Sequence, residues 1–408
     1  METLIDRLKA LGVSLGSTNI KPREKFPIEK VVHGEWLHGS LGDIFKVSED
    51  FTNGYKHGRM NLESNFSFSR VLQVNGLTSE GITLEDILFM DTETTGLSGG
   101  TGTMAFLVGL GYFSKNGFTI DQFFLDDPVN ELAFLNEAGN YFSRYKVIAT
   151  FNGSSFDLPL LKTRFVLNRI DPPFQNKPHL DLLHLSRKIW KLRLSSLKLK
   201  DLENEILKFQ REENEVPGWM VPQIYFDFIG SRDARPLGGV FYHNRMDVLS
   251  LALLFNLASE LISDPLESIS AHKEDMLSIA RMIEDFGFTR QSEMLYQVLF
   301  EKGLPENLSA RTLLRFGFIC RKHQHLDFAL KFWTSSFEKG EYRAAIEISK
   351  IFEYQTRDYP NALLWARSSI DLLRSNQVEK YPSNTFQDEI IKRINRLEDK
   401  IKKSHEKN

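Results

Sequence analysis

The stretch Asp91-Thr-Glu93-Thr-Thr-Gly96 directly follows the apolar run Ile87-Leu-Phe-Met90, which is typical of a buried central strand. Side chains two residues apart in a strand point to the same face, so Asp91 and Glu93 are expected side by side where the strand ends. Two like charges in a partly desolvated cleft repel each other, unless a hard cation binds between them. Because Mg²⁺ and Mn²⁺ prefer carboxylate oxygen, the stretch predicts a metal site at the end of this strand.

The segments around this strand predict an α/β fold. Apolar runs predict strands over 104–113, 118–125 and 147–151, and Ser114-Lys-Asn-Gly117 predicts a hairpin turn. Apolar stripes predict a helix over 130–145 and further helices over 157–168, 182–192, 196–208, 222–230 and 239–263. This order predicts a mixed sheet flanked by helices on both faces.

A second acid follows the strand 147–151, in Phe151-Asn-Gly-Ser-Ser-Phe-Asp157. Asn152-Gly153 indicates a sharp turn. Asp157 would then lie in the first turn of the next helix. An acid there also suits the helix dipole, so helix capping alone is an alternative interpretation.

A third group lies in Tyr242-His243-Asn-Arg-Met-Asp247, ahead of an apolar helix. If the helix already includes His243, that residue and Asp247 share one face, and Tyr242 points away. The alternative is a helix on which the histidine and the acid are incidental.

These residues resemble a known family. An Asp-x-Glu pair, an Asp after a strand, and a His or Tyr shortly before a last Asp are similar to the DEDD exonucleases. Four phrases resemble the YprB-type ribonuclease-H-like domain more closely: Asp91–Gly102, Phe151–Asp157, His179–Leu183 and His243–Asp247. The resemblance implies a ribonuclease-H-like fold over about 82–263, two divalent ions (Mg²⁺ or Mn²⁺) and 3′–5′ exonuclease activity. It also implies that the metal ligands are Asp91, Glu93, Asp157 and Asp247.

The expected general base departs from the family pattern. The His-type members have the base five residues before the last Asp, where this chain has Tyr242. The Tyr-type members have it four residues before, where this chain has His243. We expect His243 to be the base, because its pKa and reach suit the role and because it shares a helix face with Asp247.

Basic residues are concentrated between 187 and 200, where no acid occurs. They are Arg187, Lys188, Lys191, Arg193, Lys198 and Lys200, with Trp190 among them. This composition suits a phosphate backbone with a base stacked on the ring, although a solvated helix face is an alternative. Thr94 and Asn152, beside the acids, are further expected nucleic-acid contacts.

Three other features allow two interpretations each. Asp181 is an outer acid of the site or a structural hydrogen-bond acceptor. Ser98-Gly-Gly-Thr-Gly102 lacks the Lys and Ser or Thr of a P-loop, so it predicts a close backbone approach rather than a phosphate cradle. His33, His38 and His57 each precede a glycine and are loop histidines or a metal site.

Four regions follow from these patterns: an N-terminal extension (1–80), a ribonuclease-H-like domain (81–265), helical repeats (270–375) and a charged C-terminal helix (376–408). Phe300-Glu-Lys-Gly303 recurs as Phe337-Glu-Lys-Gly340. Helix pairs that repeat at about 34 residues are typical of tetratricopeptide stacks, and a nonrepetitive bundle is the alternative.

The composition excludes several classes of protein. The 408 residues are 41% hydrophobic and 26% charged, as in globular proteins, and the net charge of −3 requires any nucleic acid to bind at a local patch. One cysteine, Cys320, excludes an internal disulfide and a Cys-rich zinc site. Apolar runs too short to span a membrane and the lack of a visible secretory signal predict a cytoplasmic protein without a membrane partner.

The sequence therefore predicts a two-metal nuclease that acts on single-stranded DNA or RNA, as a 3′–5′ exonuclease by resemblance. One alternative is a catalytically degenerate scaffold that recruits a protein partner through its helical repeats. Another is a structure-selective endonuclease that uses the same site.

Overall fold

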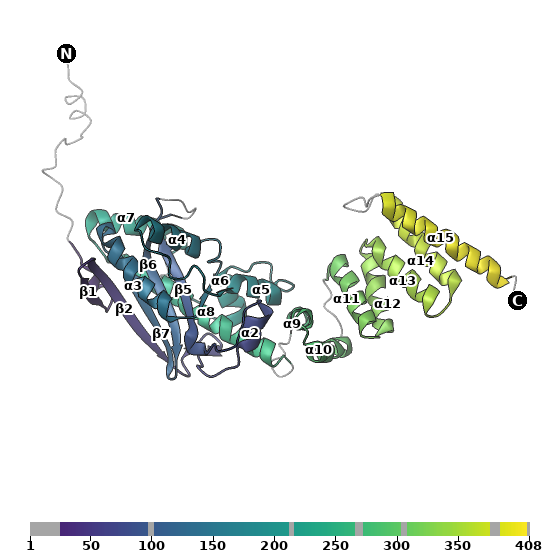
Figure 1. Cartoon of the computed structure of the whole chain (residues 1–408), viewed down its shortest axis with the longest axis horizontal. Helices are drawn as coiled ribbons and strands as arrows, with labels where there is room; N and C mark the ends of the chain where they lie inside the picture. The colour runs from purple at the N-terminus through teal and green to yellow at the C-terminus, as the bar shows by residue number, and fades with distance from the viewer. Residues whose placement is uncertain are drawn as a thin grey trace, which may run out of the picture. The chain divides into compact units, whose positions relative to one another are not determined.

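The computed structural model describes residues 25–96, 102–211, 216–265, 272–302, 308–375 and 384–405. The chain divides into two compact units. The first comprises residues 1–270 and 281–288, and the second comprises residues 271–280 and 289–408. Strands occur in the first unit, and the described part of the second unit is helical (Figure 1).

A seven-stranded mixed sheet forms the centre of the first unit, in the order β1-β2-β7-β6-β5-β8-β9. Its strands are β1 (Glu35–Gly39), β2 (Gly42–Thr52), β5 (Ile87–Thr94), β6 (Ala105–Ser114), β7 (Gly117–Phe124), β8 (Val147–Thr150) and β9 (His179–Asp181). β8 is parallel to β5 and β9 to β8, while the other pairs are antiparallel. This mixed sheet with flanking helices confirms the predicted ribonuclease-H-like fold class.

Helices cover both faces of the sheet (Figure 1). They are α2 (Ser69–Val74), α3 (Glu131–Arg144), α4 (Asp157–Leu167), α5 (Leu182–Trp190), α6 (Leu199–Leu202), α7 (Val221–Ser231) and α8 (Leu237–Ser263). On β7, Gln122 donates a hydrogen bond to α8, whereas the ring of its neighbour Phe123 makes an edge-to-face contact with Tyr141 of α3. Adjacent strand residues point to opposite faces, so α3 and α8 lie on opposite sides of the sheet.

Helix α8 is the core helix of this unit. It is long and apolar enough to cross a membrane by length and composition, but 83% of its most apolar window is buried inside the protein. Two glycines of β6 let it approach the sheet, because a side chain at Gly109 would overlap Asn244 and one at Gly111 would overlap Val248. The close approach brings α8 against the acids of β5.

Residues 35–52, which the sequence patterns assigned to an extension outside the nuclease-like domain, supply β1 and β2 of its sheet. β2 pairs from Phe45 to Thr52 with the whole length of β7. A small hairpin of β3 (Lys56–His57) and β4 (Met60–Asn61) follows. Arg59 N of this hairpin donates to Leu207 O at 2.7 Å, in the π-helical turn η5 (Glu203–Leu207).

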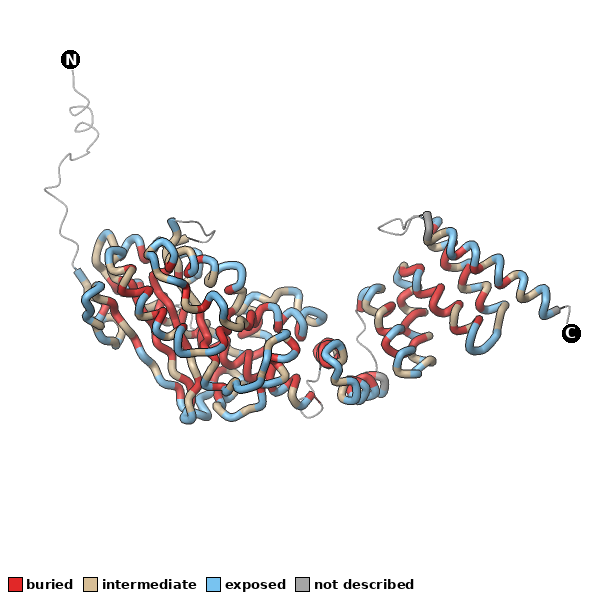
Figure 2. The backbone as a smooth tube through the Cα atoms, viewed as in Figure 1, coloured by how far each residue is buried: buried red, intermediate tan, exposed pale blue. Residues whose placement is uncertain are grey.

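The second unit consists of antiparallel helices with alternating buried and exposed faces (Figure 2). Its helices are α10 (Thr289–Lys302), α11 (Ala310–Lys322), α12 (Leu326–Glu338), α13 (Tyr342–Tyr354), α14 (Tyr359–Arg374) and α15 (Asn384–His405), and α9 (Lys273–Asp285) spans the division between the units. The pairs α11–α12 and α13–α14 each form a hairpin of helices. In the first hairpin a side chain at Gly317 would overlap Trp333. The helical region is confirmed, and its tetratricopeptide character stays a prediction.

The C-terminal helix α15 is held to α13 by a buried acid. Glu353 of α13 accepts hydrogen bonds from Arg393, Arg396 at 2.9 and 3.1 Å, and Lys400 at 2.8 Å. Burial alone would raise the pKa of Glu353, but these cations outweigh it and lower the pKa. Some of the charged residues of α15 therefore hold this helix against α13, and do not only form a solvent-exposed face.

Candidate active site

Asp91 and Glu93 lie at the end of the central strand β5, as the sequence predicts. Asp91 pairs in register with Gly109 of β6. Because that glycine admits α8, Asn244 Nδ2 donates to Asp91 Oδ2 at 2.9 Å and to its backbone oxygen at 3.2 Å. Gln122 Nε2 in turn donates to Asn244 Oδ1 at 2.8 Å, so the amide that holds Asp91 has a fixed orientation.

Asp157 is the first residue of α4, and its position is set by the turn before the helix and by a hydrogen bond from β5. Asn152 adopts a left-handed backbone conformation (φ 63°), which makes the turn that the Asn-Gly sequence predicts. Thr92 Oγ1, on β5 between the two acids, donates to Asp157 Oδ1. This hydrogen bond ties the start of α4 to the strand that carries Asp91 and Glu93.

His243 and Asp247 lie on one face of α8, which confirms the predicted helical spacing. His243 Nε2 is 3.5 Å from Asp247 Oδ2 and 3.9 Å from Glu93 Oε1. Tyr242 instead lines a separate cavity of about 420 Å³ with Glu49 and Arg245, so it points away from the acids as expected.

The four acids share one electrostatic environment. Burial raises the pKa of Asp91 well above its usual range, and the charges of Asp247, Glu93 and Asp157 raise it further. Burial and the charges of Asp247 and Asp157 likewise raise the pKa of Glu93. Burial raises the pKa of Asp157 to about 6. Such mutual repulsion is typical of acids that are arranged to share cations or protons.

Two charged residues that the sequence did not indicate join this cluster. Arg211 donates to Glu203 through Nε and Nη2, at 2.7 Å each, and through Nη2 also to Asp247 Oδ1. Its Nη1 lies 3.3 Å from His243 Nδ1. Glu203 is fully buried and also accepts from Ser250 Oγ at 2.6 Å. No local motif marks either residue, because their partners are distant in sequence.

The chemistry of the donor set fits a hard divalent cation. Asp91, Glu93, Asp157 and Asp247 offer only carboxylate oxygens, the ligands that Mg²⁺ and Mn²⁺ prefer. Within the described ranges, however, no three His, Cys, Asp or Glu side chains form a group that could already hold a metal ion. Asn244, Thr92 and Arg211 each engage one oxygen of an acid, so ion binding would require local adjustment.

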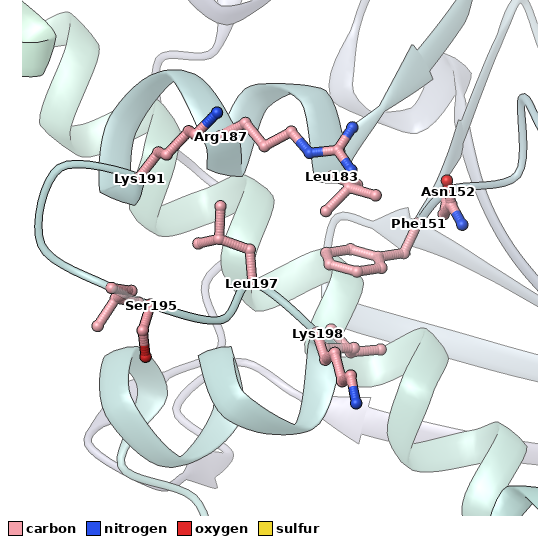
Figure 3. A pocket seen from close by; sticks show the side chains of 10 residues that line it. Phe151, Asn152, Leu183, Arg187, Lys191, Ser195, Leu197 and Lys198 are labelled. Carbon is pink, nitrogen blue, oxygen red and sulfur yellow. The ribbon is translucent and has the colours of Figure 1, made fainter. Parts of the chain in front are cut away.

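A pocket of about 740 Å³ lies next to the loop that leads to Asp157, although none of the four acids lines it. Its lining includes Phe151 and Asn152, from the loop that leads to Asp157, and Lys198 and Leu199, from the segment that leads to Glu203. Arg187 and Lys191 extend from α5 along one side, and the Phe151 ring projects between Leu183 and Leu197 (Figure 3). Three residues of the predicted basic segment, Arg187, Lys191 and Lys198, thus line a cavity with an aromatic ring.

The other predicted contacts of the basic segment do not line this pocket. Trp190 is 2% exposed in the core, so its predicted stacking on a base is wrong. Lys188 is bonded to Val74 O at 2.8 Å and to Asn75 Oδ1 at 3.1 Å, which turns it toward α2. Arg193 lies past the end of α5, outside the pocket. The helical period explains the division, because Arg187 and Lys191 are four residues apart and share the solvent face.

Asp181 and Thr94 both make local hydrogen bonds near the acids. Asp181 accepts from Ser154 Oγ at 2.6 Å and from Asn152 N at 2.8 Å, so it is a structural acceptor that fixes the loop before Asp157. Thr94 Oγ1 donates to Gly96 O at 2.8 Å, and its contact with nucleic acid stays a prediction. The glycine-rich stretch lies outside the described residues except for Gly102.

The three histidines that precede glycines do not form a metal group within the described residues. His38 is exposed on β1 and lies 3.0 Å from Asp43. His57 is buried against Phe209, with ring centroids 3.7 Å apart. Burial, together with the charge of Arg211, lowers the pKa of His57 to about 4. Of the two interpretations, the alternative of a three-histidine metal site is therefore not supported among the described residues.

Comparisons with known proteins agree with this architecture. Residues 88–259 match the family model of the RNase H superfamily. The chain is 33% identical to the YprB protein of Bacillus subtilis (strain 168) over 301 residues, which cover 72% of this chain and 71% of that protein.

Two solved structures show weaker similarity. One is the family B DNA polymerase from Pyrobaculum calidifontis, with 15% identity and a TM-score of 0.34 over 59% of this chain and 33% of the polymerase. The other is E. coli Exonuclease I in complex with a dA16 oligonucleotide, with 16% identity and a TM-score of 0.29 over 52% of this chain and 45% of that one. The chain thus spans less than half the length of either protein. By its sheet, its family match and its identity with YprB, the chain belongs to the YprB-type family of ribonuclease-H-like proteins.

Proposed function

We propose that this protein is a metal-dependent nuclease that hydrolyses phosphodiester bonds of single-stranded nucleic acid, and that it removes nucleotides in the 3′–5′ direction. One observation carries the proposal. Four acids from three separate segments of the chain interact near the end of β5. Beside burial, the charges of the other three raise the pKa of Asp91, and those of Asp247 and Asp157 raise the pKa of Glu93. A purely structural site has no use for such repulsion, whereas a site for divalent cations requires it.

The residues of the chain would divide the work as follows. Asp91, Glu93, Asp157 and Asp247 would hold two Mg²⁺ or Mn²⁺ ions. When bound, such a pair activates the attacking water and stabilises the leaving oxygen. Asn244 holds Asp91 by a hydrogen bond, and Thr92 holds Asp157 in the same way. His243 presents Nε2 to the same acids, so it would contact the attacking water or the phosphate.

The pocket next to the loop before Asp157 supports a single-stranded substrate. Arg187, Lys191 and Lys198 can pair with phosphates, and the Phe151 ring offers a stacking surface for an unpaired base. Phe156, directly before Asp157, is a second aromatic ring and is 54% exposed. Both surfaces require a base that is free of its partner strand.

A noncatalytic scaffold is the second candidate, and one observation favours it. Asp247 is already ion-paired with Arg211 among the described residues, so its charge has a partner without a cation. The two candidates differ in the affinity for Mn²⁺, which a scaffold does not need.

End-labelled oligonucleotides test the proposal. Purified protein is incubated with 5′-labelled single-stranded DNA or RNA and with Mg²⁺ or Mn²⁺. A ladder that shortens from the 3′ end one nucleotide at a time supports an exonuclease. Internal products from a circular single strand would instead indicate an endonuclease. A lack of products on every substrate and with both metals would refute the nuclease.

A further inference from the structure

Arg211 links the acids of the site to His243, and no sequence pattern assigns it a role. Among the described residues, its guanidinium contacts Glu203 through two hydrogen bonds of 2.7 Å, Asp247 Oδ1, and His243 Nδ1 at 3.3 Å. The side chain is only 4% exposed. A lysine could not match this arrangement, because its single ammonium lacks the planar fork of donors.

Further buried residues hold Glu203, the ion-pair partner of Arg211, in place. Ser250 Oγ donates to Glu203 Oε1 at 2.6 Å, and His57 Nε2 lies 3.1 Å from the same hydroxyl. Since the hydroxyl proton goes to Glu203, the ring of His57 is the donor in the second contact. His57 also stacks on Phe209, two residues before Arg211. The guanidinium is therefore fixed by a buried chain of hydrogen bonds, which starts in the β3–β4 hairpin.

The contact with Nδ1 determines which nitrogen of His243 carries the proton. A guanidinium only donates, so Nδ1 must accept, and the proton of a neutral ring then lies on Nε2. Nε2 is also the nitrogen that faces Asp247 Oδ2 and Glu93 Oε1, at 3.5 and 3.9 Å. An N–H directed at carboxylates is the favourable arrangement. In this state His243 offers a donor to the site, not the free lone pair that a general base needs at Nε2.

The contact with Arg211 gives the two carboxylate oxygens of Asp247 different partners. Oδ1 is engaged by Arg211, while Oδ2 faces His243. Residues behind metal ligands commonly fix the orientation of the ligand in this way.

We propose that Arg211 is a positioning residue of the nuclease site, which holds Asp247 with Oδ2 toward the cations and keeps His243 protonated at Nε2. This inference rests on the proposed nuclease function. It replaces the expected general-base role of His243 with that of a hydrogen-bond donor to the attacking water or the phosphate. A merely structural role, as the partner of buried Glu203, would leave the tautomer of His243 and the affinity for metal unchanged.

The tautomer is measured on metal-free protein with ¹⁵N-labelled histidine, by long-range proton–nitrogen NMR. The signal of His243 is assigned from its loss in His243→Gln. We expect the Nε2–H form in the unmodified protein. The double substitution Glu203→Gln with Arg211→Met removes the ion pair without changing the net charge, and we expect a mixture of both tautomers. If this variant does not fold, Arg211→Lys replaces it, with the same shift expected.

A matched pair of residues provides the control. Arg245 lies on α8 beside this face and pairs with Glu49, away from the acids. Glu49→Gln with Arg245→Met removes an Arg–Glu ion pair by the same substitutions at a more exposed place, so the tautomer of His243 should stay unchanged in this control. An Nδ1–H form in the unmodified protein, or an unchanged tautomer in the Arg211 variant, would overturn the proposal.

Calorimetric titration with Mn²⁺, in the absence of nucleic acid, gives the second readout. The Arg211 double variant should bind Mn²⁺ about 10- to 100-fold more weakly than the unmodified protein, as is usual when a partner of a metal ligand is removed. The control variant should bind normally. Equal affinities in the two variants would also overturn the proposal. If the unmodified protein itself binds no Mn²⁺, the nuclease function fails, and the tautomer result still reports on Arg211.

Discussion

Nε2 of His243 lies 3.5 Å from Oδ2 of Asp247, one turn further along α8. This pair joins the residue expected to handle the proton of the attacking water with one of the expected metal ligands. Tyr242, the neighbour of His243 in the sequence, lines a different cavity. The exchanged order of histidine and tyrosine relative to the family patterns therefore leaves a histidine at the site.

Neutralising one acid should stabilise the metal-free protein. Asp91→Asn relieves repulsion with Glu93, Asp157 and Asp247 and keeps an amide in the place of the carboxylate. We expect the melting temperature in EDTA to stay level or to rise. Glu35→Gln, which removes an exposed acid from the outer strand β1, provides the control. A clear fall in the melting temperature of Asp91→Asn alone would mean that its charge is compensated within the protein.

The stability of the metal-free protein should depend on pH through Asp157. Its pKa is about 6 in the folded protein, against 3.8 for an unperturbed Asp. Between these values the folded chain retains a proton that the unfolded chain has lost, so the free energy of unfolding falls as pH rises. The low pKa of buried His57, about 4, acts in the opposite direction. The test is therefore the difference between the unmodified protein and Asp157→Asn.

Urea denaturation in EDTA at pH 5 and pH 8 measures this difference. Asp157→Asn should gain stability relative to the unmodified protein on going from pH 5 to pH 8, since it lacks the acid that becomes charged. An equal difference at both pH values would show that Asp157 titrates normally.

Substitutions of His243 distinguish a proton acceptor from a hydrogen-bond donor. His243→Ala should lower turnover roughly 10²- to 10⁴-fold under either role. Gln places an amide N–H near the position of Nε2, so His243→Gln should recover part of the activity if His243 donates. Steady-state cleavage rates measure the recovery. Equal losses in the two variants would favour the general base, and a larger loss in Tyr242→Phe would move the role to Tyr242.

Reversing charge in the pocket should weaken the binding of nucleic acid without affecting the fold. Arg187→Glu with Lys191→Glu places two acids on the exposed side of α5, where phosphates are expected. Fluorescence anisotropy with a single-stranded oligonucleotide in EDTA should show weaker binding and a shallower dependence on salt. Lys115→Glu is the control. Lys115 lies on the turn between β6 and β7, at the end of the sheet opposite to the acids of β5. Unchanged affinity would exclude the pocket as the path of the strand.

The sequence predicted the features that depend on local order. The apolar strand before Asp91, the turn at Asn152 and the spacing of His243 and Asp247 each follow from a few adjacent residues. The same reasoning assigned Trp190 to solvent because it lies among lysines and arginines. The helical period of α5 instead turns it inward with Leu182, Leu183 and Ile189.

Features that depend on pairing between distant segments could not be predicted. β1 and β2 contain no long apolar runs, because they lie at one side of the sheet and carry exposed acids such as Glu35 and Asp50. Arg211 reaches Asp247 only because the chain turns back at Lys208, in a left-handed conformation (φ 54°), and because His57 stacks on Phe209. No spacing rule joins residues that far apart in the chain.

Cleavage by the protein and by Asp247→Asn, compared on one labelled single strand, tests the central claim most directly. The account predicts that the unmodified protein shortens the strand with Mg²⁺ or Mn²⁺ and is inactive in EDTA. It also predicts that Asp247→Asn, folded as judged by circular dichroism, is inactive with either ion, because a ligand charge is lost. Cleavage by Asp247→Asn at the unmodified rate, or cleavage by the unmodified protein in EDTA, would contradict the account.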